Sequence, residues 1–482
     1  MRSPGITKRI VALLLLFISV PQVNANDNDP VAGAPSASQL LQAKITTPGL
    51  LTHLQALDDI ARSNGGNRAF GLPGYAASVD YIWSHVSDVP GTLAWKQDFS
   101  APFEQVVSLS LSLKIDNNTP TTIPVYPLAY SPSTPPEGIT AEIVHGPEGL
   151  AGCNDTSYSD LGLDVKGKIV LIQRWNCGNT TLAGRLLPAA RNGAVAVVIY
   201  NNQTEPLTGG TLTWDNPAYV PGGFVQLEEG LRIKSALLSA SSSAETETGK
   251  KVVKATFQFT RIAEARKTQN VFVETLSGDP DNVIVLGAHL DSVQAGPGIN
   301  DDGSGTALIL ELFRAITSPS SPSSFKSKTK IRFAFWAAEE EGLLGSRHYC
   351  QSLSTAETNA ILAYLNFDMV SRGYFGVGDA DGSAHGIRAP LGSEVIEQMY
   401  EEYYSALGLT VTPARLSNSS DYAPFWRVLN KPFGYLHTGA GPQQDPCYHA
   451  ACDGFGNVNS TVLTVNAKVC VYVFLFFRFP RF

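Results

Sequence analysis

The sequence predicts an α/β fold in which a mixed, largely parallel sheet is flanked by helices and a β-rich segment is inserted. Stretches with strand and helix periodicity alternate after Thr260, as they do in α/β domains. Three of the expected strands lead into polar residues, at His289, Glu339 and Asp368. Parallel strands bring their carboxyl ends to one edge of a sheet, so we expect these side chains to share a ligand site.

Length and composition bound the remaining possibilities. The chain has 482 residues, more than most single domains, so we expect two domains. Its hydrophobic content of 43% is enough to fill sizeable cores. With 16% charged residues and a formal net charge of -8, nothing in the composition favours nucleic acid or an anionic membrane as a partner.

The first residues are typical of an export signal. Arg2, Lys8 and Arg9 precede an apolar run at residues 10–20, and small residues follow up to Ala25. We expect a signal peptide at residues 1–25 and a polar leader at 26–36. The alternative is a membrane anchor, for which the run is too short. The expected location is extracellular or, alternatively, vacuolar.

Two further residue patterns agree with export. Six N-glycosylation sequons are present, at Asn117, Asn154, Asn179, Asn202, Asn418 and Asn459. Six cysteines permit disulfides in an exported chain. A Cys447–Cys452 bridge would hold the two residues Tyr448 and His449 rigid between its ends. The sequence favours Cys153 with Cys177 as a second pair and free thiols at Cys350 and Cys470, without settling the connectivity.

Residues 37–102 come before the β-rich segment, and the family resemblance given below implies that they are the first part of the α/β domain. They carry helical patterns at residues 50–63 and 75–86, separated by a Gly/Pro loop. At residues 103–259 the pattern changes to short β-rich runs and polar turns, which indicates a separate domain. Its clearest part is a strand, helix and strand at residues 168–173, 182–192 and 194–200.

The second part of the α/β domain covers residues 260–482. Its periodicity predicts strands at residues 283–288, 330–336 and 361–367. It predicts helices at residues 305–317 and from about Leu343, with a Ser/Pro surface loop at 318–327 between them.

A histidine and several carboxylates follow the first of these strands. Neutral imidazole binds zinc well, and we expect the carboxylate of Asp291 to accept the other ring N–H of His289. Glycines would let the next loop curl back so that one of its carboxylates bridges two metals. The alternative is a solvated turn in which Asp302 or Ser304 caps a helix.

Further acidic residues follow the other two strands. Glu339 and Glu340 are adjacent, so they point in different directions; one can bind a metal while the other faces substrate, with Glu341 as a rival. A carboxylate such as Asp368 at the end of an apolar strand is costly to bury unless it is paired. The alternatives are an acidic helix start for the glutamates and a helix cap for Asp368.

Five segments carry a family resemblance, namely AHLDSV, GINDDGSG, FWAAEEEG, NFDMV and CYHAACD, in that order. With them, residues 37 to 465 resemble the co-catalytic zinc aminopeptidases, such as secreted bacterial leucine aminopeptidases and fungal aminopeptidase Y. The β-rich segment resembles a protease-associated domain inserted in the peptidase. Such domains are noncatalytic; the resemblance implies that it walls the cleft or restricts substrate size, and the alternative is a spacer.

The resemblance implies a site with two Zn²⁺ ions, for which Mn²⁺ or Co²⁺ could substitute. His289 and Asp368 would bind one ion, Glu340 and His449 the other, and Asp301 both. It also implies peptide substrates with a free N-terminus, and we expect a monomer without a membrane span.

The catalytic roles also come from the resemblance. It implies Glu339 as the general base, Asp291 as the residue behind the histidine ligand, and Tyr448 as a hydrogen-bond donor to the oxyanion. The alternative for Tyr448 is packing.

Two segments depart from the family. Relatives often read GRSDY where this chain has NSSDY, with Ser419 in place of arginine, which leaves amine positioning and side-chain preference open. Residues 469–477 form an uncharged run that predicts a buried strand or a helix continuation, and we interpret the RFPRF end as an aberrant tail.

Other functions stay open at this stage. A carboxypeptidase or dipeptidase could use the same scaffold, and a noncatalytic ectodomain could be built on an inactive peptidase. The five expected ligands and Glu339 argue against the inactive form. A glutaminyl cyclase uses a single zinc, which the larger ligand set disfavours.

Overall fold

The computed structural model describes residues 37–116, 118–178, 181–207, 209–213, 215–242, 252–318 and 328–476. The expected signal peptide (1–25) and leader (26–36) lie outside these residues. So do Asn117, Asn179 and the chain after Phe476.

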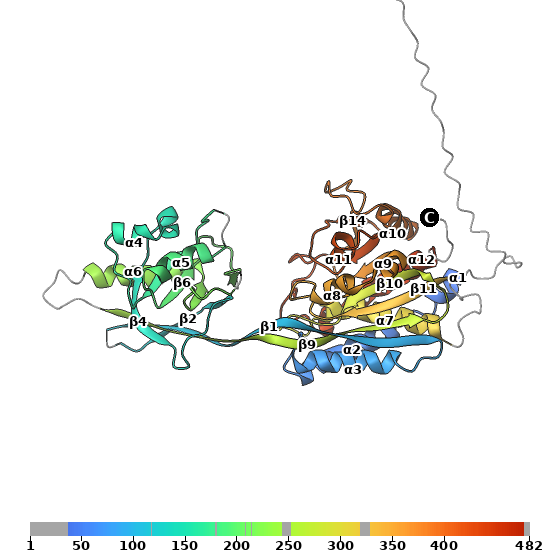
Figure 1. The fold of residues 1–482 in the computed structure, drawn as a ribbon, viewed down its shortest axis with the longest axis horizontal. Helices are drawn as coiled ribbons and strands as arrows, with labels where there is room; N and C mark the ends of the chain where they lie inside the picture. Colours follow the sequence, from blue (N-terminus) through green and yellow to red (C-terminus); the bar gives the residue numbers. More distant parts are fainter. Residues whose placement is uncertain are drawn as a thin grey trace, which may run out of the picture. The chain divides into compact units, whose positions relative to one another are not determined.

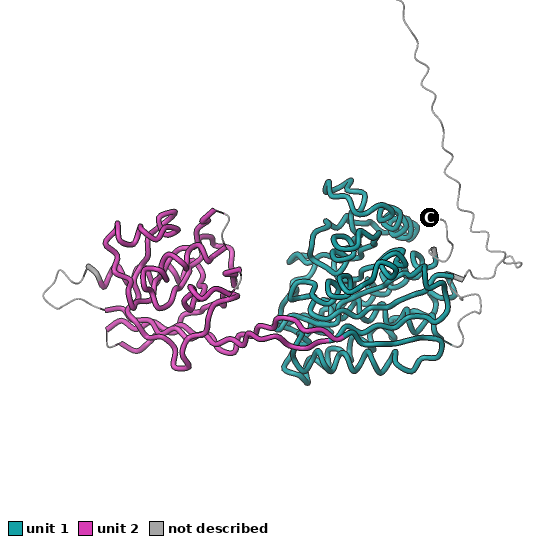
Figure 2. The backbone as a smooth tube through the Cα atoms, viewed as in Figure 1, with its two compact units in different colours: residues 1–97, 269–482 teal, residues 98–268 magenta. Residues whose placement is uncertain are grey.

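The chain divides into two compact units, shown in teal and magenta in Figure 2. Unit 1 comprises Met1–Gln97 and Gln269–Phe482, and unit 2 comprises Asp98–Thr268. Two long strands, β1 (Thr92–Ile115) and β9 (Val253–Thr275), pass from one unit into the other and pair with each other. The insertion expected at residues 103–259 falls within the range of unit 2.

The sheet of unit 1 has the strand order β14-β13-β15-β12-β10-β11-β9. Four of its strand pairs are parallel, β10 with β11, β10 with β12, β12 with β15 and β13 with β14. The pairs β11 with β9 and β13 with β15 are antiparallel. The expected mixed, largely parallel sheet is therefore confirmed. Its strands are β10 (Asp279–His289), β11 (Thr329–Trp336), β12 (Ile361–Phe367), β13 (Phe375–Gly378), β14 (Val411–Ala414) and β15 (Phe433–His437).

Helices lie on both sides of this sheet (Figure 1). The side chains of β11 alternate between the two faces. Phe333 meets Phe313 of α7 with ring centroids 5.5 Å apart, whereas Trp336 packs near Phe425 of α11 at 6.0 Å. The helices of unit 1 are α1 (Ala37–Gln42), α2 (Thr47–Ser63), α3 (Pro73–Val86), α7 (Ser304–Thr317), α8 (Leu344–Ser352), α9 (Thr355–Ala360), α10 (Ser393–Ala406), α11 (Tyr422–Arg427) and α12 (Ser460–Phe476).

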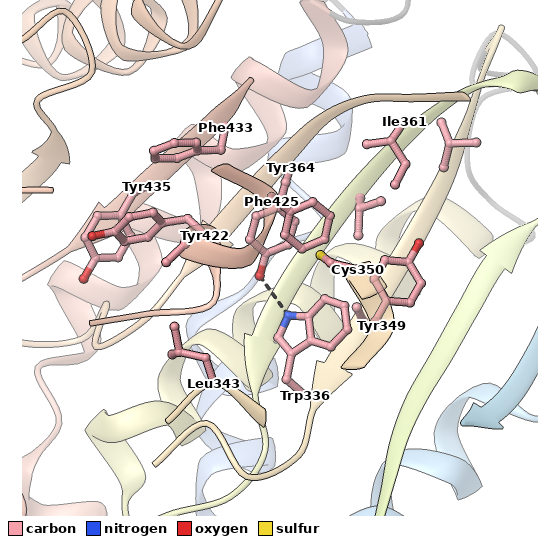
Figure 3. Packing of buried hydrophobic residues seen from close by; sticks show 14 of the residues in the cluster. Trp336, Leu343, Tyr349, Cys350, Ile361, Tyr364, Tyr422, Phe425, Phe433 and Tyr435 are labelled. Carbon is pink, nitrogen blue, oxygen red and sulfur yellow. Dashed lines mark hydrogen bonds between the residues drawn. The ribbon is translucent and has the colours of Figure 1, made fainter. Parts of the chain in front are cut away.

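An aromatic cluster fills one face of the sheet, between its strands and helices α8 and α11 (Figure 3). The Trp336 indole donates a hydrogen bond of 2.8 Å to the Tyr364 hydroxyl. The Tyr364 ring stacks on Phe425 with centroids 3.9 Å apart. Trp336 and Tyr364 are fully buried, so the end of β11 and the middle of β12 are held firmly a few residues before their acidic residues.

The strands and helices expected in unit 1 all form, with ends that shift by a few residues, whereas residues 319–327 of the expected Ser/Pro loop lie outside the described part of the chain. The strand at residues 361–367 has the predicted limits. For the uncharged run near the end of the chain, the structure takes the helical alternative, because α12 continues unbroken to Phe476. Among the described residues, no helix has both the length and the apolar character needed to cross a bilayer.

Unit 2 contains the expected strand, helix and strand as β5 (Ile169–Gln173), α5 (Ala183–Arg191) and β6 (Ala196–Tyr200). Its strands are ordered β9-β4-β5-β6-β8-β3-β7. A disulfide joins Cys153 to Cys177. The remaining elements are β2 (Thr121–Ile123), β3 (Tyr126–Ala129), β4 (Ile139–His145), α4 (Thr156–Asp160), β7 (Gly210–Thr211), β8 (Gly222–Val225) and α6 (Leu227–Ser242).

Candidate metal centre and active site

Three parallel strands deliver the polar residues of the site to one edge of the sheet. His289 is the last residue of β10 and lies in register with Trp336 at the end of β11. Glu339 and Glu340 follow β11, and Asp368 follows β12 directly. The two further contributors, Asp301 and His449, come from segments outside these strands.

The His289 ring lies among three aspartates. Its Nε2 atom is 3.1 Å from Asp301 Oδ1 and 3.7 Å from Asp368 Oδ1. Its Nδ1 atom is 3.1 Å from the backbone oxygen of Asp291 and 3.7 Å from the Asp291 carboxylate. The ring nitrogen that faces Asp301 and Asp368 is therefore the one directed into the candidate metal site.

Asp291 faces the outer nitrogen of the His289 ring, and its expected role behind that ligand stays a prediction. Its backbone carbonyl, rather than its carboxylate, is the nearer acceptor for the His289 ring. The carboxylate instead accepts the backbone N–H groups of Glu339 at 3.1 Å and Glu340 at 3.3 Å. These two donors lie in the segment that follows β11. Asp291 thus links the histidine to the glutamate pair.

His449 approaches from the opposite side of Asp301. Its Nε2 atom is 3.2 Å from Asp301 Oδ2 and 3.0 Å from Glu340 Oε2. The Cys447–Cys452 disulfide forms as expected and closes the loop that carries it. The Tyr448 ring stacks on the His449 ring with centroids 3.8 Å apart.

Asp301 therefore directs one oxygen to each histidine, Oδ1 to His289 and Oδ2 to His449. Its backbone is held by Asp453, whose two oxygens accept the N–H groups of Asn300 at 2.9 Å and Asp301 at 3.0 Å. Asp301 is thus held with its two oxygens facing different histidines.

Asp302 has a structural role, but the alternative of a solvated cap is not what forms, because Asp302 is buried and Gly303 is the N-cap residue of α7. Its carboxylate accepts three backbone N–H groups, from His289 at 3.2 Å, Gly305 at 2.8 Å and Met369 at 3.1 Å. These donors belong to β10, the start of α7 and the loop after β12. Asp302 ties these three segments together, and its oxygens are already occupied.

Burial and mutual repulsion perturb the acids of the site. Burial raises the pKa of Glu339 well above its usual value and that of Glu340 to about 7, with Asp301 adding to the latter. Burial acts to lower the pKa of both histidines, but the surrounding carboxylates outweigh it. They raise the pKa of His449 to about 10 and that of His289 well above 6.5. The site therefore carries excess negative charge and attracts cations.

The donors also fit metal ions geometrically. His289, Asp301 and Glu340 place one ligand atom each within 4.8 Å of one another. His289, Asp302 and Asp368 do so as well, although the Asp302 oxygens already accept backbone N–H groups. Glu340 Oε1 is buried and has no hydrogen-bond partner among the described residues. An orphaned carboxylate oxygen next to imidazole nitrogens is the kind of atom that a divalent cation satisfies.

A pocket of about 110 Å³ opens onto these residues. Glu339 lines it and is only 8% exposed, whereas Tyr448 is 40% exposed at its wall. The remaining lining comes from Asp301, Glu340, Asp368, Met369, Ser419, Tyr435, His437, Ala440 and His449.

Several contributors to the site escaped the sequence reasoning. His437 lines the pocket and has its Nδ1 atom 3.0 Å from the Asp368 carbonyl oxygen. Arg68 and Asp453 contact the segment between His289 and Asp301, from which both residues are distant in the sequence. No local pattern assigns them these contacts, although Asp453 ends the segment CYHAACD; only the folded structure shows them.

Comparisons with known proteins show which family the chain resembles. The model of Peptidase family M28 matches residues 270–474, and that of the PA domain matches residues 139–233. A probable lipoprotein aminopeptidase of Mycobacterium tuberculosis is 33% identical over 96% of this chain and 92% of its own length. Leucine aminopeptidase 2 of Arthroderma otae is also 33% identical, over 94% of this chain and 86% of its own length.

Solved structures share the fold. An aminopeptidase from Aneurinibacillus sp. strain AM-1 matches with a TM-score of 0.66 and 25% identity, over 91% of this chain and 95% of its own. A zinc aminopeptidase from Bacillus subtilis matches with a TM-score of 0.62 and 23% identity, over 89% of this chain and 94% of its own. The two aminopeptidases that are 33% identical match nearly the whole chain, and the family models match its two parts. The chain therefore belongs to peptidase family M28 and carries a PA domain.

Proposed function

We propose that this metalloaminopeptidase removes the N-terminal residue of peptides and uses two zinc ions as its cofactor. The observation that carries the proposal is the position of Asp301, with one oxygen toward each histidine. A site for one ion would need only one of these contacts.

The chain's own residues divide into two ligand sets around that carboxylate. His289 and Asp368 would hold one ion, and Glu340 and His449 the other, with Asp301 shared. All donors are nitrogen or oxygen atoms, which suits Zn²⁺ and allows Mn²⁺ or Co²⁺ to substitute. The orphaned Glu340 Oε1 atom supports this set.

Glu339 is the proposed general base. It lines the pocket beside Glu340 and Asp368, and Asp291 fixes its backbone. When bound here, zinc supplies Lewis acidity to the scissile carbonyl and to the attacking water. Glu339 takes a proton from that water as the C–O bond forms, then passes it to the amide nitrogen as the C–N bond breaks. Tyr448 donates a hydrogen bond to the oxygen that gains charge.

The relatives and the charge of the site support cleavage at the free N-terminus. The M. tuberculosis and A. otae proteins are named aminopeptidases. The excess of carboxylates around the pocket provides acceptors for a substrate α-ammonium group. Met369, Tyr435 and Ala440 give the pocket an apolar part for a terminal side chain.

We also propose that the protein is exported, to the extracellular space or alternatively to the vacuole. Two disulfides support an oxidising destination. The four sequon asparagines within the described part of the chain, Asn154, Asn202, Asn418 and Asn459, are all exposed. The expected monomeric state stays a prediction.

The proposal is tested with leucine p-nitroanilide and its N-acetylated form, using purified protein before chelation, after chelation and after zinc is returned. We expect cleavage of the free-amine substrate only, loss of that activity on chelation and recovery with zinc. Cleavage of neither substrate by the metal-loaded protein would contradict the proposal and favour a carboxypeptidase or dipeptidase.

A further inference from the structure

Arg68 is a buried cation close to the candidate metal centre. It lies in the loop between α2 and α3, and its side chain is completely buried. The guanidinium donates from Nε to the carbonyl oxygen of Pro297 at 2.9 Å, from Nη2 to that of Gly298 at 2.5 Å, and from Nη1 to that of Leu290.

These acceptors share one location, the loop that leaves β10 after His289 and returns at Asp301. The backbone of Arg68 contacts the same loop, because its N–H donates to Ser292 Oγ at 2.9 Å. The Ser292 hydroxyl in turn lies 3.0 Å from the Gly296 carbonyl oxygen. The Arg68 contacts therefore hold both ends of this loop.

The positive charge of Arg68 lies close enough to several carboxylates of the site to interact with them. The carboxylates of Asp291, Asp302, Asp453 and Asp301 act on it electrostatically and oppose the lowering of its pKa by burial. A fixed cation here offsets part of the repulsion among these acids. Lysine would keep that charge, but it lacks the planar fork that reaches three carbonyls in different directions.

We propose that Arg68 is a positioning residue for the metal centre, which fixes the His289 to Asp301 loop and thereby sets the affinity for zinc. The inference rests on the proposed function, since it requires metal binding at His289 and Asp301. The hydrogen bonds of Arg68 go to this loop, at Leu290, Ser292, Pro297 and Gly298, and so Arg68 acts through the loop.

Unit 2 offers a matched control in Arg185. Its side chain is likewise fully buried, and it donates to the carbonyl oxygens of Gln173 at 2.8 Å, Gly149 at 2.8 Å and Pro147 at 3.4 Å. Unit 2 holds none of the proposed ligands. R185K therefore measures the general effect of replacing a buried arginine that binds carbonyl groups.

The experiment compares the full-length wild type, R68K and R185K after chelation. Zinc affinity is measured by competition with a chromophoric chelator, the visible spectrum is recorded with Co²⁺ bound, and thermal unfolding of the metal-free proteins is followed. We expect R68K to bind zinc about 10- to 100-fold more weakly, with a changed Co²⁺ spectrum. R185K should keep the affinity and spectrum of the wild type.

Wild-type affinity and an unchanged Co²⁺ spectrum in R68K would overturn the inference, as would an equal loss in R185K. If R68K does not fold, Ser292→Ala decides, because it loosens the same loop and keeps the guanidinium: weaker zinc binding supports the inference, and unchanged binding overturns it. A wild type that binds no zinc would overturn the proposed function and this inference together.

Discussion

At the scale of single residues, neighbouring acids acquire different roles from their surroundings. Glu340 lies 3.0 Å from His449, whereas Glu339 faces the pocket. Glu341, the third acid of the run, is exposed. The sequence left Glu341 as a rival to Glu339, and its exposure now argues against it as a base at the metal centre.

Replacement of Glu339 by glutamine should separate catalysis from metal binding. We expect E339Q to lower kcat by about 10²- to 10⁴-fold, because the proton acceptor is lost while the side-chain length is kept. Zinc affinity should stay close to that of the wild type. E341Q is the matched control and should retain kcat. Steady-state kinetics together with zinc titration check both variants, and an equal loss in E341Q would refute the assignment.

A second residue-scale prediction concerns stability and pH at Glu397 of α10. This side chain is 7% exposed, and its Oε2 atom accepts the N–H groups of Ala380 at 3.0 Å and Asp381 at 2.8 Å. Burial, with Asp381 and Glu401, raises the pKa of Glu397 from 4.5 to about 7. Between pH 4.5 and about 7, Glu397 keeps its proton in the folded protein but loses it in the unfolded chain. The contribution of Glu397 to the free energy of unfolding therefore falls as the pH rises through this range.

Glu397→Gln should remove that contribution, because glutamine does not titrate. The difference in unfolding free energy between variant and wild type should therefore change across this window and level off well above pH 7. Denaturant unfolding of both proteins over a pH series measures it, and metal effects common to both cancel in the difference. Parallel profiles throughout the window would show that Glu397 does not titrate as described.

At the scale of elements, the site depends on loops that are anchored from several directions. Asn300 shows this, because its Nδ2 donates to Asp445 at 2.7 Å and its Oδ1 accepts the Ser371 hydroxyl at 2.7 Å. Asp445 precedes the disulfide loop, and Ser371 follows Asp368. The three segments that carry Asp301, Asp368 and His449 are thus joined through one buried amide, so a shift in one should displace the others.

Loss of the Cys447–Cys452 bridge should weaken zinc binding and lower kcat/KM, since His449 would no longer be held in a closed loop. The two cysteines are 5 residues apart, so the chain-entropy contribution to stability is about 2 kcal/mol. The double variant C447S/C452S tests this by unfolding and by zinc titration. C153S/C177S removes the disulfide of unit 2 as a control, and equal effects on zinc affinity would contradict a specific role.

At the scale of the whole molecule, the sequence predicts the strands and the site residues at their ends, because these follow from local patterns and from one rule of sheet topology. His289 and Asp368 end apolar runs of strand length, so their place at the sheet edge follows from periodicity. Arg68 could not be predicted, because its acceptors lie 222 to 230 residues away in the sequence. The same holds for Asp453, which binds backbone groups 152 and 153 residues away. Its neighbours in the sequence give no sign of that contact.

Metal binding should also stabilise the folded chain as a whole. Zinc at about 100 times its Kd would add about 2.7 kcal/mol per site. Chelation should therefore lower the Tm, and zinc should restore it. Calorimetry of the chelated and reloaded protein measures the shift; an unchanged Tm would mean that the acids of unit 1 hold no metal.

The central claim is that two zinc ions share Asp301 in one hydrolytic site. The most direct test is to titrate the metal-free protein with zinc and to measure both the bound zinc and the rate of leucine p-nitroanilide cleavage. The account predicts that the rate reaches its maximum only as a second equivalent per chain is bound. Full activity with one equivalent bound, or without any zinc, would contradict it.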